Sequence, residues 1–222
     1  MHNRRHFLQA TAASALLAAP AMRAADTEMN VLGPRPGYSP QIGTLVSEMT
    51  WMRGAVLQTV KGLNQAQLDF LLDDKANRIG ALLLHLAATE KLFQLNTFDG
   101  LLPDDLFKSA AFKDWAVPMD LGEPARQAIK GRDLDYYLNL LQQGREKTFA
   151  EFRKRDDTWL MAVDKTWGWG PTNNLCKWFH VCEHESHHTG QIALLKSRAP
   201  GAKPNSTHIW KNPSYIDAQA LS

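Results

Sequence analysis

Apolar residues recur every three or four positions along four long stretches of the chain, which is the period of an α-helix with one buried face. The first stretch follows Ser39-Pro40, a pair typical of a helix start, with serine as the cap and proline in the first turn. This stretch predicts a helix from Pro40 to about Lys61, with an inward stripe made of Ile42, Leu45, Val46, Met49, Met52, Val56 and Val60.

The next two stretches lie on either side of a connection that contains three prolines. We expect the second helix to run from about Asn77, its cap, to Asn96, and the third to begin after Asp133, also a cap. The connection has roughly 35 residues and leaves room for a crossover. The inward stripe of the third helix is Leu134, Tyr137, Leu138, Leu141, Thr148, Phe149 and Phe152.

The fourth helix is expected to follow the loop TWGWGPTNN, which spans Thr166 to Asn174, and to run to about Arg198. The loop carries Trp167 and Trp169. These two rings could roof a pocket or plug the end of a bundle, and plugging is the favoured interpretation.

Together the four stretches predict one all-α domain, a four-helix bundle over residues 40–198. A lead segment at 26–39 precedes it, and a C-terminal tail at 199–222 follows it. No β-alternation of useful length lies between the predicted helices. With 44% hydrophobic residues, the chain of 222 residues has enough apolar surface for a domain core.

Residues 1–25 predict a removable export signal. The segment has Arg4-Arg5 near its start, an alanine-rich apolar stretch to Ala19, and small residues after it. That stretch is too short to remain as a membrane-spanning helix. The paired arginines followed by Phe7 resemble a twin-arginine (Tat) signal, and an ordinary secretory signal is the alternative. We therefore expect a periplasmic or extracytoplasmic protein with no membrane attachment once the signal is removed.

The net charge and the two cysteines limit which functions the sequence supports. The formal net charge is +2, and removing three arginines with the signal leaves about −1, so the charge gives no reason to expect nucleic-acid binding. The two cysteines, Cys176 and Cys182, would lie about 9 Å apart along one helix and point about 120° away from each other. They are expected to be small buried residues that form no disulfide.

Four histidines fall in HVCEHESHHTGQI, residues 180–192. His184 and His188 lie about 40° apart on adjacent turns, the i, i+4 relation in which two imidazoles can hold one ion. His180, one turn before His184, is left open as a fourth ligand or a pocket residue. Residues expected to support the site without binding metal directly, or to contact a bound molecule, are His187, Glu183 and Gln191.

The second predicted helix supplies a third candidate ligand, because His85 lies in the middle of its inward arc. A buried imidazole without a partner costs on the order of 1–3 kcal/mol. Sharing a cation with His184 and His188 would satisfy it and leave a position open to water or substrate, as in a reactive metal site. Glu90 lies about 140° from His85 around the helix, which argues against it as a ligand. The alternative is a satisfied core histidine and an ordinary surface pair.

These motifs resemble the DinB-like (DinB/YfiT) superfamily of four-helix metalloproteins. The resemblance rests on HLAATE at residues 85–90, its lead-in RIGALLLHL and the histidine motif at 180–192, and it spans about residues 40–198. It implies an up-down-down-up bundle and, as in many members, a homodimer. It also implies a divalent ion, most often zinc or nickel, held by three histidines that match His85, His184 and His188.

The resemblance further implies a thiol-dependent transferase in which the metal lowers the pKa of a thiol. A hydrolase with metal-activated water is one alternative, and a non-catalytic periplasmic metal- or ligand-binding module is another. The expected partner is a small-molecule substrate or a thiol. The sequence identifies no catalytic residue, and the bases nearest the stripe are Glu183, His180 and His187. No cluster of arginines or lysines flanks the histidine stripe to pair with a thiol's carboxylates, although Arg53, Arg78 and Lys177 could approach it.

Overall fold

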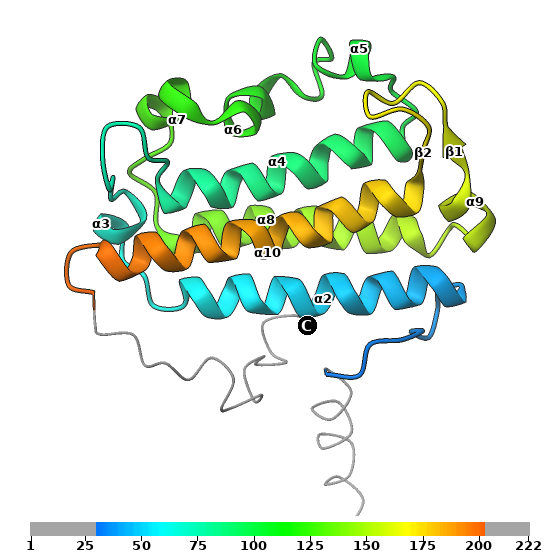
Figure 1. The fold of residues 1–222 in the computed structure, drawn as a ribbon, viewed down its shortest axis with the longest axis horizontal. Coiled ribbons are helices and arrows are strands. Elements are labelled where there is room, and N and C mark those ends of the chain that lie inside the picture. The colour runs from blue at the N-terminus through cyan, green and yellow to red at the C-terminus, as the bar shows by residue number, and fades with distance from the viewer. Residues whose placement is uncertain (1–29, 203–222) are drawn as a thin grey trace, which may run out of the picture.

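The computed structural model describes residues 30–202, and the expected signal peptide and most of the expected tail lie outside them. Four long helices lie side by side along the long axis of the molecule (Figure 1). They are α2 (Pro40–Val60), α4 (Ile79–Thr97), α8 (Leu134–Phe152) and α10 (Asn174–Arg198). The all-α prediction is confirmed. Within this part of the chain, no helix combines the length and the hydropathy needed to cross a bilayer.

The long helices run in two opposite directions. In Figure 1, α2 and α10 run from right to left, whereas α4 and α8 run from left to right. Helix α10 packs against both α2 and α4, and α4 packs against α8. The largest apolar side chains in the core between them, Trp178, Tyr137 and Phe93, are almost completely buried. Helix α10 therefore has α4 as a close neighbour, although more than 70 residues separate the two in sequence.

The N-terminal end of α2 is capped by a residue from another element. Ser39 occupies the predicted N-cap position, but its side chain caps no backbone amide of α2. Its hydroxyl instead donates to Asp157 Oδ1 at 2.5 Å, and that carboxylate accepts from the backbone amides of Gln41 and Ile42. The carboxylate lies at the positive end of the helix dipole and satisfies amides that have no partner within the helix.

The predicted cap of the third helix is confirmed, whereas that of the second is wrong. The side chain of Asp133 accepts from Tyr136 N at the start of α8. Helix α4, however, begins at Ile79 with Arg78 in the N-cap position. The Asn77 side chain lies one residue too early and accepts from Gly122 N in the crossover.

Short helices form the connections. Helix α3 (Gln65–Leu68) follows α2. The crossover between α4 and α8 contains α5 (Pro103–Leu106), the 3-10 helix η1 (Lys113–Trp115), α6 (Ala116–Asp120) and α7 (Gly122–Ala128). Figure 1 shows it running back along α4, and α6 packs on α4.

The segment before α10 contains a strand pair that the sequence pattern does not predict. After α9 (Asp157–Met161), strand β1 (Val163–Asp164) pairs antiparallel with β2 (Thr172–Asn173). Two residues per strand are too few to show an alternating pattern. The loop between the strands carries the two tryptophans of the TWGWG sequence.

Candidate metal centre

Three histidines from two helices meet between α4 and α10. His85 Nε2 lies 3.2 Å from His184 Nε2, and His188 Nε2 lies 2.9 Å from the same atom. One ligand nitrogen from each of the three lies within 4.8 Å of the others. His85 and His188 are buried and His184 is half-buried. The three residues selected from helical periodicity therefore form one cluster that could hold a metal ion.

Hydrogen bonds from neighbouring groups fix the tautomers of two of these rings. His85 Nδ1 lies 3.0 Å from the carbonyl oxygen of Pro118, and His188 Nδ1 lies 2.8 Å from Gln191 Oε1. Both oxygens can only accept, so each Nδ1 carries the proton and donates it. The Nε2 atoms of His85 and His188 consequently present lone pairs toward His184, as metal-binding histidines do.

The carbonyl oxygen of Pro118 is free to accept from His85 because helix α6 ends at Asp120. In a continuing helix this oxygen would accept from the amide four residues later, at Gly122. Leu121 instead takes a positive φ of 55°, and Gly122 N donates to the Asn77 side chain. The end of α6 thus leaves one backbone acceptor available to His85, a contact that sequence periodicity alone did not reveal.

The three rings have more nitrogen lone pairs facing one another than N–H donors to satisfy them, which favours a cation at the centre of the cluster. His184 Nε2 faces both neighbouring lone pairs and can donate to one of them at most, while its buried Nδ1 has no partner among the described residues. Burial, reinforced by the neighbouring imidazoles, lowers the pKa of His184 to about 3. Burial also lowers the pKa of His188 to about 4 and that of His85 below its usual value. Extra protons therefore do not satisfy these nitrogens near neutral pH.

The donor set fits a divalent transition metal. Nitrogens held about 2.0–2.1 Å from a zinc ion in a near-tetrahedral arrangement lie about 3.3 Å from one another. The two separations from His184 Nε2, 2.9 and 3.2 Å, are close to that value, and all three nitrogens lie within 4.8 Å of one another. Three neutral imidazoles suit zinc, nickel and similar ions better than calcium or magnesium, which prefer oxygen.

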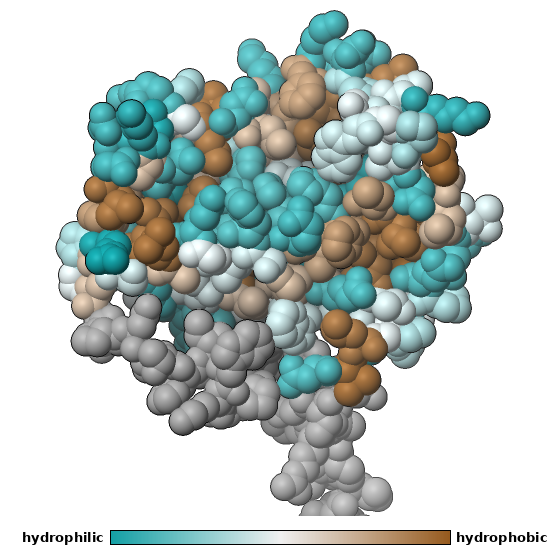
Figure 2. Space-filling model, viewed as in Figure 1, coloured by the Kyte–Doolittle hydropathy of each residue, from teal (hydrophilic) through white to brown (hydrophobic). Residues whose placement is uncertain are grey.

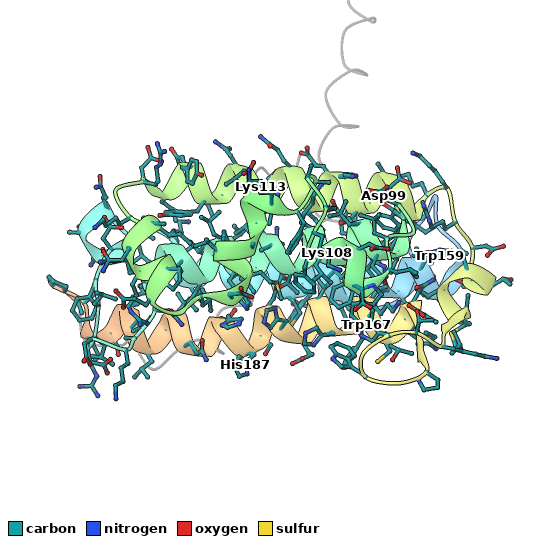
Figure 3. The ribbon with its side chains drawn as sticks, turned by 90° about the horizontal axis from the view of Figure 1, so that it is seen from above. Asp99, Lys108, Lys113, Trp159, Trp167 and His187 are labelled. Atoms are coloured by element: carbon teal, nitrogen blue, oxygen red, sulfur yellow. The ribbon has the colours of Figure 1, made fainter. Side chains whose placement is uncertain are left out.

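The other predicted site residues on α10 lie around the cluster. His180 stacks on His184 with 5.1 Å between ring centroids, and its Nδ1 bonds to Glu183 Oε1 at 2.8 Å. His180 is therefore beside the cluster of three and not part of it. His187 is exposed on the outer side of α10 (Figure 3) and lies 3.2 Å from Gln191 Nε2. Gln191 thus links His187 to His188.

The basic residues expected near the histidines have other partners. Arg53 lies in a buried group of charges, described below, and the Lys177 ammonium donates to Asn96 Oδ1 and Asp164 Oδ2, each at 2.7 Å. The Arg78 guanidinium donates to the backbone carbonyl of Asp69. Each of these three side chains therefore joins segments of the chain through contacts outside the histidine cluster.

A buried charge network lies next to the histidines on α10. Arg53 Nη2 lies 2.5 Å from Glu185 Oε1 and 3.0 Å from Glu90 Oε2. Arg145 contacts the same two carboxylates at 2.8–2.9 Å, and no side chain in the group is more than 4% exposed. Burial opposes ionisation of Glu90, but the guanidiniums, Arg145 first, hold its pKa below its usual value. Each long helix contributes one of these four charges.

Sequence reasoning missed this network, although the sequence contains a signal for it. Arg53 falls between the buried Met49 and Val56, and Glu185 between the buried Val181 and Ile192, so both charges occupy stripe positions. A charge at such a position requires a buried partner of opposite sign. Which charges pair could not be read without the arrangement of the helices.

The two tryptophans of the loop before α10 have different positions. The Trp167 ring packs on Phe93, with 5.5 Å between centroids, and the Lys177 ammonium lies 4.5 Å from its centre. Trp169 is 57% exposed, and its ring lies 5.1 Å from that of His180. Trp167 therefore plugs the end of the bundle as expected, whereas Trp169 extends the loop toward the histidines.

The cysteines differ from the prediction in one respect. Both are free thiols, and Cys182 is buried as expected. Cys176 is exposed, because it lies on the outer side of the first turn of α10. Neither belongs to the cluster of three histidines.

The bundle and its clustered histidines lie within a segment that matches a family of known proteins. The family model described as mycothiol-S-transferase matches residues 44–201. The matched segment contains the whole of α4, α8 and α10, most of α2, and all three clustered histidines. A search of curated proteins gave no match. By the extent of the family match, the chain belongs to the DinB-like mycothiol-S-transferase family.

Proposed function

We propose that the protein is a thiol-dependent transferase that holds a zinc or nickel ion through His85, His184 and His188. The observation that carries this proposal is the convergence of three imidazole nitrogens, two of them fixed as lone-pair donors by Pro118 and Gln191. When bound, a divalent ion would lower the pKa of a thiol that reached its open position. The description of the matched family supports a thiol as one reactant.

The pair formed by His180 and Glu183 is suited to accept the proton of that thiol. His180 donates from Nδ1 to Glu183, which leaves Nε2 as a free acceptor on a ring stacked against His184. A histidine oriented by a carboxylate is a common general base. We propose His180 as the base, whereas the exposed His187 is bonded to Gln191 and faces away from the cluster.

Export and partners are proposed on the sequence alone. We propose that the twin-arginine segment directs the folded protein to the periplasm, where it is a homodimer without membrane attachment. Its near-neutral charge supports a small-molecule substrate and gives no support for nucleic acid. Co-purification from a periplasmic fraction and the mass in solution would test these points.

The first experiment is metal analysis of the full-length protein by elemental mass spectrometry. We expect about one ion per chain in the wild type, loss in His85→Ala, and retention in the control His187→Ala, whose side chain is exposed on the same helix as two of the ligands. A metal-free, stable wild type would contradict the proposal. Loss of metal from both variants to the same extent would contradict the assignment of the ligands.

The second experiment separates thiol transfer from its alternatives. After cobalt substitution, mycothiol, cysteine and 2-mercaptoethanol are added in turn and the visible spectrum is recorded. A spectral change that saturates with one of these thiols supports the proposal. No change with any of them, together with ester hydrolysis that depends on His184, would favour a hydrolase. Tight metal binding with neither effect would favour a binding module.

A further inference from the structure

A cavity of about 220 Å³ lies one helical turn from the clustered histidines. Leu82 on α4 precedes His85 by three residues, and Gln191 on α10 follows His188 by three residues. Both line the cavity. Its full lining is Lys75, Ala76, Asn77, Leu82, Gln191, Leu194 and Leu195. The same glutamine that orients His188 therefore forms part of the cavity wall.

The floor of the cavity is apolar and its edge is cationic. Leu82 and Leu195 are 1% and 6% exposed, and Leu194 adds an exposed apolar side chain. Figure 2 shows the face on which α10 lies, with hydrophilic residues over its middle and apolar patches to either side. Lys75 is exposed at the edge, and its ammonium has no acidic partner within residues 30–202. No acidic residue lines the cavity.

Gln191 offers a second polar contact. Its Oε1 accepts from His188, and one hydrogen on its Nε2 is directed to His187. A side-chain amide has two N–H donors, so one remains available. Asp73 and Asp74 precede Lys75 but do not line the cavity. Asp73 is occupied in a turn, where it accepts from the backbone amides of Lys75 and Ala76. The polar groups offered to a bound molecule are thus mainly donors and one cation.

We propose that this cavity binds a small apolar molecule that carries a carboxylate, with the apolar end on Leu82 and Leu195 and the carboxylate between Lys75 and Gln191. The inference rests on the proposed function, in which the cavity would hold the second reactant beside the thiol. Its volume is below the roughly 300–1,000 Å³ typical of sites for drug-sized ligands. The occupant is therefore about the size of one ring with a short chain.

The test compares two probes that share a phenyl ring and a short chain and differ in the terminal group, a charged carboxylate or a neutral hydroxyl. Full-length protein loaded with zinc is titrated with 3-phenylpropionate and with 3-phenylpropanol, and binding is followed by amide NMR. We expect the carboxylate to bind about fivefold more tightly, the size of an exposed charge pair. Amide signals of Leu82, Gln191 and Leu194 should shift. The variant Lys75→Met should remove the preference, and Lys108→Met, an exposed lysine on the crossover (Figure 3), should keep it.

Further variants separate this inference from the proposed metal site. Leu194→Asp should weaken binding of both probes, since it places a negative charge on the apolar wall. Equal binding of the probes, or a preference that survives Lys75→Met, would overturn the inference even when zinc is present. If the protein holds no zinc, the proposed function fails, and the same titration still tests the cavity because none of its lining residues is a proposed ligand.

Discussion

The histidines of α10 differ in what their ring nitrogens contact. His188 donates from Nδ1 to an amide oxygen, and His180 donates from Nδ1 to a carboxylate. His184 has no partner for its Nδ1 among the described residues. An oxygen that accepts from Nδ1 fixes the orientation of the ring and leaves Nε2 as the nitrogen that can accept a proton or bind a metal ion. The three rings are therefore suited to different tasks, although they lie within nine residues.

Replacing the proposed base should slow the reaction without removing the metal. We expect His180→Gln to lower the rate of thiol transfer by about a hundredfold, within the range for loss of a general base. Metal content should not change, because His180 is not one of the clustered ligands. Initial rates over a range of pH and elemental analysis would check both points. An unchanged rate would show that another group takes the proton, and Glu183→Gln should produce a smaller loss.

The two thiols should react at very different rates. Burial raises the pKa of Cys182 to about 12, so the thiolate that reacts is almost absent at neutral pH, whereas Cys176 is exposed. We expect a disulfide reagent such as DTNB to modify one thiol quickly in the folded protein and the second only after denaturation. The variant Cys176→Ser should lose the fast phase. Two fast phases in the wild type would contradict the buried position of Cys182.

At the scale of helices, close packing explains a glycine whose role the sequence pattern leaves open. Gly80 lies in the first turn of α4, where an added Cβ would be 2.5 Å from the hydroxyl of Tyr137 on α8. Tyr137 is completely buried and its ring cannot move aside without disturbing the core. Gly144, in the middle of α8, has open space at the same position.

These two glycines provide a matched pair of substitutions. Gly80→Ala should lower the free energy of unfolding by about 1–3 kcal/mol, because overpacking exceeds the gain in helix propensity. Gly144→Ala should raise it by up to about 1 kcal/mol through helix propensity alone. Urea unfolding followed by circular dichroism would measure both. Stabilisation by Gly80→Ala would show that α4 and α8 are farther apart than described.

Helix faces could be predicted from sequence better than helix ends. The periodicity of α4 and α10 places His85, His184 and His188 on facing surfaces, because each helix fixes its own side-chain directions. The cap of α4 could not be predicted, since Asn77 bonds to a residue 45 positions away. The same reason applies to Pro118, whose carbonyl reaches His85 through the packing of the crossover. Local patterns describe an element, and contacts between elements need the fold.

At the scale of the whole molecule, the buried charge network joins all four long helices. A buried carboxylate or guanidinium that loses its partner raises the free energy of the folded state far more than the intact network does. The network therefore favours one arrangement of the helices over others in which these charges would be separated. The pairing within this network could not be predicted from the sequence, because its four side chains lie on helices that are distant from one another in sequence.

Breaking the network should destabilise the fold strongly. We expect Glu90→Gln to lower the free energy of unfolding by about 3–5 kcal/mol, since Arg145 loses the charge that offsets its burial. The control is Asp99→Asn, which removes an exposed charge 4.0 Å from Lys147 and should change stability by less than about 1 kcal/mol. Thermal and urea unfolding would compare them. Equal effects would mean that the buried charges are hydrated.

The carbonyl of Pro118 connects metal affinity to a distant part of the chain. Because the strained backbone at Leu121 leaves that oxygen free for His85, the conformation of the crossover helps to decide which nitrogen of His85 carries the proton. Binding linkage is reciprocal, so any change that loosens the crossover should weaken metal binding, and metal binding should protect the crossover from proteases by the same free energy. The rate at which proteases cut the crossover would therefore indicate whether the protein holds a metal ion.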